Sequence, residues 1–374
     1  MKILILDGDN FQALRLLRDL GKEHSVYIGG KTKKKTLSYY SRFCNGFVNY
    51  QDDSINEFEK VLKFIQSKRI DLIIPTTERS CVIVNHYRID IQNFAFCSIA
   101  TSSMRDLEVA FDKSKTFDFC QKNNIKTPLI EFQNSEKINS KFVVLKAITS
   151  NKVLSNGKIV KTDVPEYFKN DKPLLNNDND KFFQEHIKGS SVGFFAVCNK
   201  GEILDSYTHK RILDTNPSGS GSCVRKSILS PNKDLIEISK KIIQNLNWNG
   251  PIMLEYLQNK QGDLYLLEIN GRLWGSYCLS SYSGINFTNL LLNLYSKVPK
   301  KNIIEKSKRK EVIVTNEVLL LYRWIRILKG PDKNSSEKFP KRLKIISELK
   351  FLFAKKEIFS AFDPLPILRF LWIK

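Results

Sequence analysis

The N-terminal part of the chain alternates short apolar runs with segments of helical periodicity. Residues 3–6 form a continuous apolar run, a polar turn follows, and residues 11–20 place apolar side chains at helical spacing. The alternation continues with further apolar runs at 70–74 and 94–100. Strands that alternate with helices favour a parallel sheet covered on both faces, with ligands near the carboxyl ends of its strands. We therefore predict a parallel α/β domain over residues 1–105.

The pattern changes after this domain. Residues 106–126 have helical periodicity as far as Asn124, and we interpret them as a connector. Residues 127–300 combine strands with hairpins and long polar loops, which is typical of an α+β fold. The remaining segment is basic and helical in periodicity, so we predict a basic helical C-terminal extension at 301–374.

Charge is the most unusual feature of the composition. Among 374 residues, 60 Lys and Arg stand against 39 Asp and Glu, which leaves a net charge of +21. The 42% hydrophobic residues exclude a disordered chain, and the positive surplus predicts a phosphate-rich ligand, a nucleic acid or an anionic membrane surface. Residues 301–374 alone hold 18 basic against 8 acidic residues. This segment needs an explanation of its own.

Cysteine spacing and hydropathy indicate in which cellular compartment the protein lies. The 7 cysteines are odd in number, scattered and never spaced as C-x-x-C, so we predict neither a disulfide framework nor a zinc knuckle. Residues 1–10 lack the features of a signal peptide and are interpreted as a first strand. No window of about 18 residues is apolar and free of charge, which argues against a spanning helix. We therefore expect a reduced, cytoplasmic chain.

The strongest chemical signal is a hairpin at residues 250–276. A two-residue loop at 261–262 brings Glu255 directly opposite Glu268, where two like charges are destabilising unless a cation joins them. Asn270 lies two residues further along and points to the same face. Two carboxylates and an amide oxygen on one face predict a hard-oxygen site for Mg²⁺. A loop of four residues keeps Glu255 opposite Glu268, whereas a loop with an odd number of residues does not. The alternative to a metal site is an exposed hairpin whose acids are solvated.

Four weaker signals accompany the hairpin. Arg272 follows on the same side and can bind a phosphate or a carboxylate through its fork of donors. Lys146 lies inside the apolar run 142–147, where a lysine is either an edge residue that extends to solvent or a cation that reaches a phosphate. The bend at 185–189 either offers backbone groups to a base or is an ordinary turn. The Gly-Ser run at 218–222 is either a phosphate loop or a linker.

Taken in this order, these segments resemble the ATP-grasp superfamily, and most closely its carbamoyl-phosphate-synthase-like carboligases. The most specific part is MLEYL followed by LYLLEINGRLWGS, which is similar to the family's acidic strand and its E-x-N-x-R segment. The resemblance covers residues 1–300. It implies a pre-ATP-grasp α/β domain at 1–105, an ATP-grasp small lobe at 127–186 and a large lobe with the metal site at 187–300.

The resemblance also implies nucleotide contacts. The helix start FDKSKTF makes Lys113 a nucleotide-contacting lysine, and the strand FVVLKA is similar to the one whose lysine, here Lys146, meets the ATP phosphates. In FFQEHIKG, which resembles the interlobe hinge, adenine is implied to contact Gln184, the Glu185 carbonyl and the Ile187 amide.

The remaining implied roles concern the ribose, the phosphates and the metal. Ser190 or Ser191 stands where related sequences often carry a carboxylate for the ribose hydroxyls, and the flap after Lys146 has only one glycine. The implied cofactors are ATP and Mg²⁺, or Mn²⁺ in its place. The implied metal ligands are Glu255, Glu268 and Asn270, and the implied catalytic residues are Arg272 and Lys210 or Arg211.

The mechanism implied by the resemblance is ATP-dependent coupling of a small-molecule carboxylate to an amine through an acyl phosphate. Positioning and charge neutralisation dominate both steps, which suits the acids and cations identified here. One alternative is a kinase or another phosphoryl-transfer enzyme. The other is a basic membrane-surface or nucleic-acid binder with a degenerate ATP site. The intact acidic and cationic set argues against degeneracy, so no nucleic-acid partner is expected. The oligomeric state stays open, although homodimers are common among similar proteins.

The C-terminal extension carries an amphipathic pattern. Leu343, Ile346, Leu349 and Phe353 lie along neighbouring helical turns, with lysines at the rim. Either this apolar side packs on the ATP-binding lobes, or residues 335–374 contact an anionic inner membrane face as an interfacial helix.

Overall fold

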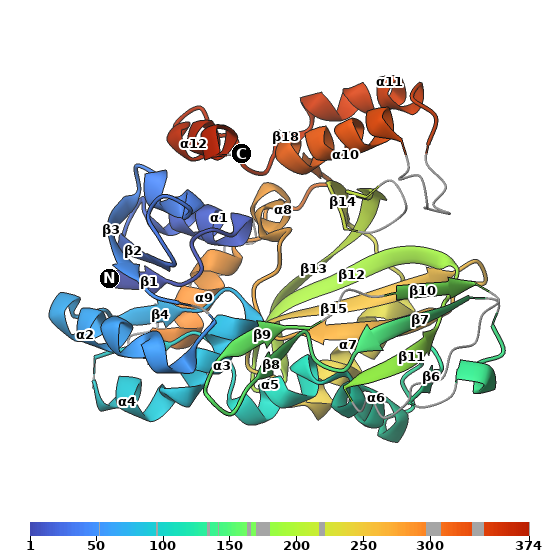
Figure 1. Cartoon of the computed structure of the whole chain (residues 1–374), viewed down its shortest axis with the longest axis horizontal. Helices are drawn as coiled ribbons and strands as arrows, with labels where there is room; N and C mark the ends of the chain where they lie inside the picture. Colours follow the sequence, from blue (N-terminus) through green and yellow to red (C-terminus); the bar gives the residue numbers. More distant parts are fainter. Residues whose placement is uncertain are drawn as a thin grey trace.

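A five-stranded parallel sheet with the order β3-β2-β1-β4-β5 forms the N-terminal part of the molecule (Figure 1). The predicted parallel α/β arrangement is therefore confirmed. The sequence pattern does not indicate β3, because this edge strand buries only Val48. The structure is a computed structural model that describes all residues except 52, 95, 133–134, 141, 163–165, 170–179, 217–220, 297–307, 331–339 and 374. The elements of this part are β1 (Lys2–Ile5), α1 (Phe11–Leu20), β2 (Ser25–Gly30), η1 (Leu37–Tyr40), β3 (Cys44–Asn49), η2 (Ile55–Phe58), α2 (Glu59–Lys68), β4 (Leu72–Ile74), α3 (Glu78–His86), α4 (Arg88–Asn93) and β5 (Ser98–Ile99).

The connector consists of two helices, α5 (Met104–Phe111) and α6 (Lys113–Lys122), instead of one. The chain is extended at Asp112, whose side chain caps α6 by accepting the backbone N–H of Lys115 at 3.2 Å. The backbone N–H of Lys113 donates to the Ile148 carbonyl at 3.0 Å. The break therefore places the start of α6 beside the sheet that follows.

Two sheets make up the next part of the chain, and their strands pair antiparallel except for β17 and β18. The smaller has the order β10-β7-β11-β6 and lies near the short hairpin of β8 and β9. The larger has seven strands in the order β16-β15-β12-β13-β14-β17-β18. Their elements are β6 (Ile130–Glu131), η3 (Ser135–Lys137), β7 (Phe142–Ala147), β8 (Asn151–Val153), β9 (Ile159–Lys161), β10 (Glu166–Lys169), β11 (Lys181–Glu185), β12 (Gly189–Asn199), β13 (Glu202–Leu213), β14 (Val224–Ile228), α7 (Lys233–Asn245), β15 (Gly250–Asn259), β16 (Leu264–Asn270), α8 (Tyr277–Tyr282), α9 (Phe287–Tyr295) and β17 (Ile313–Thr315), with β18 (Lys355–Lys356) at the far edge.

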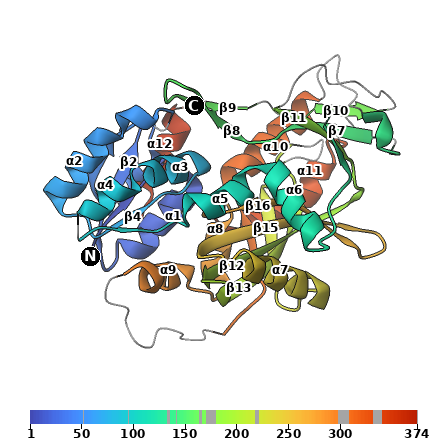
Figure 2. The same cartoon turned by 90° about the horizontal axis from the view of Figure 1, so that it is seen from below.

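Side chains alternate between the two faces of the seven-stranded sheet. In β12, Phe194 and Ala196 join a core cluster with α5, α6 and α7, which lie along this face when the molecule is seen from below (Figure 2). Phe195 and Val197 join a different cluster on the other face, with α8 and α9. The parity of a residue in the strand thus decides which side of the sheet it serves.

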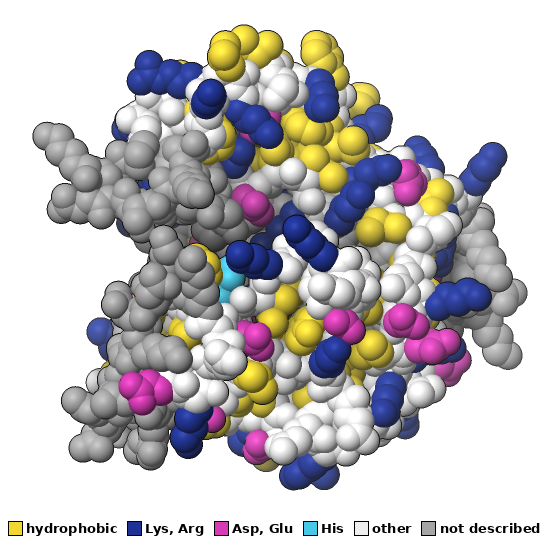
Figure 3. Space-filling view, turned by 90° about the vertical axis from the view of Figure 1, so that its right-hand side faces the viewer, with side chains coloured by type: hydrophobic (Ala, Val, Ile, Leu, Met, Phe, Trp, Pro, Cys, Tyr) yellow, Lys and Arg dark blue, Asp and Glu magenta, His cyan; other side chains and the backbone are white. Residues whose placement is uncertain are grey.

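The C-terminal segment combines helices with strands. β17 and β18 extend the seven-stranded sheet, so the segment is not a purely helical extension. Outside them lie α10 (Glu317–Lys329), α11 (Lys344–Glu348) and η4 (Leu349–Phe353), whose surface is at the top of Figure 3. α12 (Leu365–Ile373) contacts η1 of the N-terminal part. No helix in the described part of the chain is long and apolar enough to cross a membrane.

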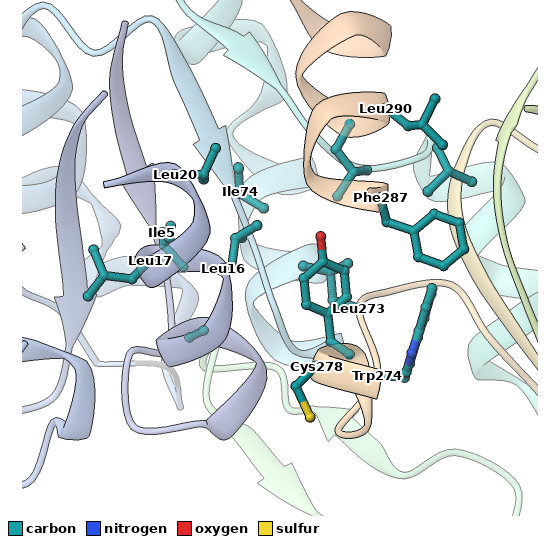
Figure 4. Packing of buried hydrophobic residues seen from close by; sticks show 14 of the residues in the cluster. Ile5, Leu16, Leu17, Leu20, Ile74, Leu273, Trp274, Cys278, Phe287 and Leu290 are labelled. Carbon is teal, nitrogen blue, oxygen red and sulfur yellow. The ribbon is translucent and has the colours of Figure 1, made fainter. Parts of the chain in front are cut away.

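One apolar cluster joins the N-terminal part to the large sheet. Leu16 of α1 and Ile74 of β4 contribute from one side, and Trp274 and Phe287 contribute from the other (Figure 4). The indole N–H of Trp274 donates to the Tyr207 hydroxyl at 3.1 Å, so this buried ring is also satisfied as a donor. The segment that follows the E-x-N-x-R motif is therefore held by a core that spans both parts of the molecule.

Candidate active site

The hairpin of β15 and β16 places Glu255 directly opposite Glu268, as predicted, but by a different route. The backbone N–H of Asn259 donates to the Asp263 carbonyl at 3.0 Å, so the loop between them has three residues. Such an odd loop alone would put Leu267 opposite Glu255. A bulge in β16 leaves Leu267 unpaired and restores the opposition of the two acids.

The bulge also decides which way the end of β16 faces. Leu266 before the bulge and Ile269 after it pack in the same core cluster, although their numbers differ by three. The alternation therefore shifts by one residue, and Glu268 shares a face with Glu255 instead of pointing into the core. The adjacent leucines at 266–267, in an otherwise alternating strand, are the sequence signal for this shift.

Glu255 and Glu268 face each other in a buried setting. Burial raises the pKa of Glu255, the opposed Glu268 raises it further, and the Arg211 guanidinium acts against both. Burial also tends to raise the pKa of Glu268, but the Asn270 amide, which donates to this carboxylate at 2.8 Å, and three cations lower it below the ordinary value. The pKa of Glu255 is thus shifted upward and that of Glu268 downward. The three cations are Lys113, Lys146 and Arg272.

These residues fit a hard divalent cation. Carboxylate and amide oxygens are the preferred ligands of Mg²⁺, and a cation between Glu255 and Glu268 would relieve the repulsion that raises the Glu255 pKa. Asn270 ends β16, and its amide oxygen accepts from Arg272 at 2.9 Å. In the described part of the chain, no group of three or more His, Cys, Asp and Glu could hold a metal. The Asn270 amide oxygen would therefore have to serve as the third protein ligand of such a cation.

Lys146 approaches the acids from the smaller sheet. Its strand, β7, lies between β10 and β11, which weighs against the alternative of a lysine on an edge strand. Burial lowers the pKa of Lys146, Glu268 opposes this effect, and the charge of Lys113 adds to it. Two lysines from separate elements thus act on one carboxylate pair.

A cleft of about 420 Å³ opens between the smaller sheet and the larger one. Lys146 lines it from the first sheet, and Arg211 and Glu255 line it from the second. The segment between β11 and β12 also lines it. The side-chain nitrogen of Gln184 is buried there without a hydrogen-bond partner, which leaves a donor for a ligand. The predicted adenine contacts in this lining are Gln184, Glu185 and Ile187.

Strand alternation separates two pairs of candidates. Arg211 donates to the Glu255 carboxylate and lines the cleft, whereas Lys210 is exposed and its position in β13 faces the other way. Likewise, the Ser191 hydroxyl donates to Glu255 at 3.1 Å, whereas Ser190 is exposed on the opposite face of β12. The structure therefore brings Arg211 and Ser191 to the cleft and corrects the placement of Lys210 and Ser190 there.

A second cavity, of about 180 Å³, adjoins Glu255 and Arg211. His209, Arg225 and Trp274 line it. Burial, followed by the charges of Arg225 and Arg211, holds the pKa of His209 well below its usual value, so the ring is neutral. Its Nδ1 atom is buried and has no hydrogen-bond partner. Sequence reasoning missed this cavity, although His209 and Arg211 share a face of one strand.

The C-terminal segment supports the second cavity through Arg225. The guanidinium of Arg225 donates to the Glu357 carboxylate at 3.0 Å and to the Ser222 carbonyl at 2.6 Å. Glu357 directly follows β18 and is buried. Arg225 is thus held in place by a residue 132 positions away in the chain.

The hairpin of β8 and β9, which occupies the position of the expected flap, contacts the N-terminal part. The Asn151 amide accepts from Arg79 at 2.8 Å and donates to Glu78 at 3.1 Å. Glu78 in turn lies 3.8 Å from the Arg272 guanidinium. The candidate phosphate loop at 218–222 falls largely outside the described residues.

A parallel α/β domain followed by two antiparallel sheets that enclose a cleft forms the ATP-grasp fold. The chain is similar to a biotin carboxylase from Campylobacter jejuni in complex with β-γ-ATP, with 15% identity and a TM-score of 0.61. The similarity covers 83% of this chain and 74% of the carboxylase. The chain is also similar over 91% of its length to 90% of N5-carboxyaminoimidazole synthetase from Staphylococcus aureus complexed with ADP, with 13% identity and a TM-score of 0.61. A third similar structure is the biotin carboxylase domain dimer of Hydrogenobacter thermophilus 2-oxoglutarate carboxylase with MgADP, at 12% identity, 83% and 73% coverage and a TM-score of 0.60. The predicted fold is confirmed.

A family model leads to the same superfamily. Residues 210–318 match the family described as "ATP-grasp in the biosynthetic pathway with Ter operon". The predicted resemblance to the ATP-grasp superfamily is therefore confirmed, whereas the narrower resemblance to carbamoyl-phosphate-synthase-like carboligases stays a prediction. No curated protein matches the chain. The matched segment contains Arg211, Glu255, Glu268, Asn270 and Arg272.

Proposed function

We propose that this protein is an ATP-dependent ligase that activates a carboxylate as an acyl phosphate and couples it to an amine. The observation that carries the proposal is the opposed pair of Glu255, which lines the cleft, and Glu268, together with the four cations that act on them. Such a pair suits a divalent cation next to a transferring phosphoryl group. The similar carboxylases and synthetase, two of them with bound ADP, support the proposal at the level of fold.

In this proposal the predicted lobes, 127–186 and 187–300, hold ATP between them. Gln184 and the neighbouring backbone at the hinge would meet adenine, because a buried donor without a partner lies there. Lys113 and Lys146 would meet the phosphates. Mg²⁺, held by the acid pair and Asn270, would supply charge neutralisation at the phosphates. ATP and Mg²⁺ are thus the proposed cofactors.

The chemistry has two displacements. A substrate carboxylate oxygen attacks the γ-phosphorus, the bond to ADP breaks, and an acyl phosphate forms. The amine nitrogen then attacks the acyl carbon, phosphate leaves, and the amine loses a proton to give the amide. Arg211 and Arg272 would stabilise the charge on the transferring group, because both reach the acid pair directly or through Asn270.

The second cavity is the proposed site of the carboxylate substrate. It adjoins Glu255 and Arg211, so a carboxylate there would lie next to the phosphate end of the cleft. Arg225 offers a fixed guanidinium, and the neutral His209 offers an unpaired ring nitrogen. We infer a small carboxylate with at least one further polar group.

The test is trapping of the acyl phosphate with hydroxylamine. The full chain is incubated with ATP, Mg²⁺, hydroxylamine and a panel of amino acids, hydroxy acids and sugar acids. A ligase forms the hydroxamate, ADP and phosphate with at least one carboxylate, and the amine substrate need not be known. Glu255→Gln serves as the control for contaminating activity.

The kinase alternative has a different product pattern. A kinase that phosphorylates a hydroxyl group forms ADP and a stable phosphate ester, with neither free phosphate nor hydroxamate. ADP formation that depends on an acceptor without any hydroxamate would therefore overturn the ligase proposal. We also propose a homodimer, because the similar Hydrogenobacter thermophilus domain is a dimer, and the mass of the protein by light scattering tests this.

A further inference from the structure

Exposed apolar side chains are concentrated near the C-terminus. Of the 21 large hydrophobic residues that are exposed in the described part of the chain, 13 lie between residues 321 and 368. Single exposed hydrophobic residues are normal on a soluble protein, but a concentration of them marks an interaction surface. We use the name C-terminal helix pair for α10 and for the continuous helical segment formed by Leu343, α11 and η4.

α10 carries large apolar side chains on its buried side and also on an exposed side. Leu320 and Ile327 are buried against the rest of the molecule. Leu321, Ile325 and Leu328 lie on the outer side at helical spacing and are 46%, 51% and 51% exposed. An ordinary surface helix has one apolar side and one polar side, so the outer side of α10 lacks its usual polar cover.

The second half of the pair shows the same property. Leu343, Ile346 and Phe353 are 73%, 65% and 91% exposed, whereas Phe351 is buried beside Leu320. The predicted amphipathic side thus faces outward, and the alternative that it packs on the ATP-binding lobes is wrong. Figure 3 shows hydrophobic and cationic side chains together at this end of the molecule.

Among the described residues, no acidic side chain between residues 340 and 373 is exposed. Every described acid between residues 340 and 373 is buried and paired with an arginine. The cations nearby stay exposed, so the surface is apolar and positive. The pairs are Glu348 with Arg323, Glu357 with Arg225, and Asp363 with Arg18. The exposed cations are Lys329, Lys341, Arg342, Lys344, Lys350 and Lys355.

We propose that the C-terminal helix pair binds the surface of an anionic lipid bilayer. The apolar side chains would enter the headgroup boundary, and the cations would meet lipid phosphates. A second copy of the chain fits less well, because two cationic rims would face each other. The surface also protrudes, with Phe353 almost fully exposed, which suits a deformable layer better than a rigid groove. This contact is independent of the proposed ligase chemistry.

The test is sedimentation of the full chain with vesicles. We expect binding to vesicles of phosphatidylcholine and phosphatidylglycerol in equal parts, little binding to phosphatidylcholine alone, and release at high salt. Leu343→Ser with Phe353→Ser should weaken binding at least about tenfold, and Lys344→Gln with Lys350→Gln should weaken it at low salt. Ile89→Ser is the matched control, because Ile89 on α4 is also 73% exposed and lies outside the helix pair.

The outcomes are distinct. Absence of binding to the anionic vesicles overturns the proposal, as does equal binding by the Leu343 and Phe353 variant and by the Ile89 control. If that variant instead changes the mass of the protein in solution while no vesicles are bound, the surface joins two copies and the bilayer proposal is wrong. Unchanged thermal unfolding of each variant shows that a lost interaction is not lost folding.

Discussion

This molecule has two groups of buried carboxylates that differ in their charged neighbours. Beside the cleft, Glu255 faces Glu268, whose charge raises the pKa of Glu255 although Arg211 donates to the same carboxylate. In the C-terminal segment, each buried acid has its own arginine, as Asp363 has Arg18 at 2.8 Å. The first group leaves a charge conflict for a ligand to resolve, and the second group leaves none. Burial of an acid is therefore not by itself a sign of function; an unresolved conflict is.

The largest expected effect concerns the buried acids that are paired with arginines. Asp363→Ala leaves the buried Arg18 guanidinium without its carboxylate and should lower the free energy of unfolding by about 3–5 kcal/mol. Urea unfolding measures this. Asp263→Ala is the control, because its pair with Lys126 is exposed, and it should leave unfolding unchanged within error. An equal effect of both variants would contradict the contrast between the two groups.

Glu255→Gln tests the opposed pair of Glu255 and Glu268. It removes a proposed metal ligand and should lower ADP formation at least about 100-fold, roughly 3 kcal/mol. Thermal unfolding without metal should be unchanged or shifted upward, because the charge that Glu268 opposes is gone. Full turnover by this variant at saturating Mg²⁺ would disprove the metal assignment, and a large loss of stability would place Glu255 with Asp363.

Neighbouring cations of β13 sharpen the comparison. Arg211→Ala removes the guanidinium that contacts Glu255 and should reduce hydroxamate formation by about 10- to 100-fold. Lys210→Ala changes a residue on the other face of the strand and should have no effect on this rate. The reverse result would show that Lys210, and not Arg211, faces the cleft in solution.

Lys146→Ala should mainly affect nucleotide binding. Its side chain lines the cleft beside the acid pair, so its loss should raise the Kd of ATP about tenfold, or about 1.4 kcal/mol. Calorimetry measures this Kd. An unchanged Kd would return Lys146 to a structural role, in spite of its position in a central strand.

The smallest effect concerns pH and His209. Its folded pKa lies below the ordinary 6.5, so the folded state binds fewer protons and its stability falls as the pH drops below about 6.5. His209→Gln should reduce the loss of thermal stability between about pH 7.5 and about pH 5.5. An identical pH dependence of the variant would show that other groups cause the loss.

Much of the fold followed from local patterns. Apolar runs and helical spacing predicted the parallel sheet and located α1 correctly, because both signals depend on residues close together in the chain. The connector was only partly predicted. Its helical periodicity is continuous across Asp112, and the break is stabilised by contacts with Ile148 and Thr149, which directly follow β7.

The opposition of Glu255 and Glu268 was predicted correctly from an incorrect loop. Turn length alone does not set the strand register here, because the chain uses a three-residue loop and cancels its effect with a bulge. The same limit explains the choice between Lys210 and Arg211. Alternation shows that they point to opposite faces, but only the partner strands decide which face is the cleft.

By itself, the sequence determined the alternating elements, the acidic hairpin with its E-x-N-x-R segment, and the positive charge of the C-terminal segment. The tertiary structure alone decided which acids are paired and which are opposed. Arg18 and Asp363 are 345 residues apart, and Arg225 and Glu357 are 132 apart, so no local pattern announces either pair. Charge pairing inside a protein depends on which distant segments share a core, because only burial makes an unpaired charge costly enough to select its partner.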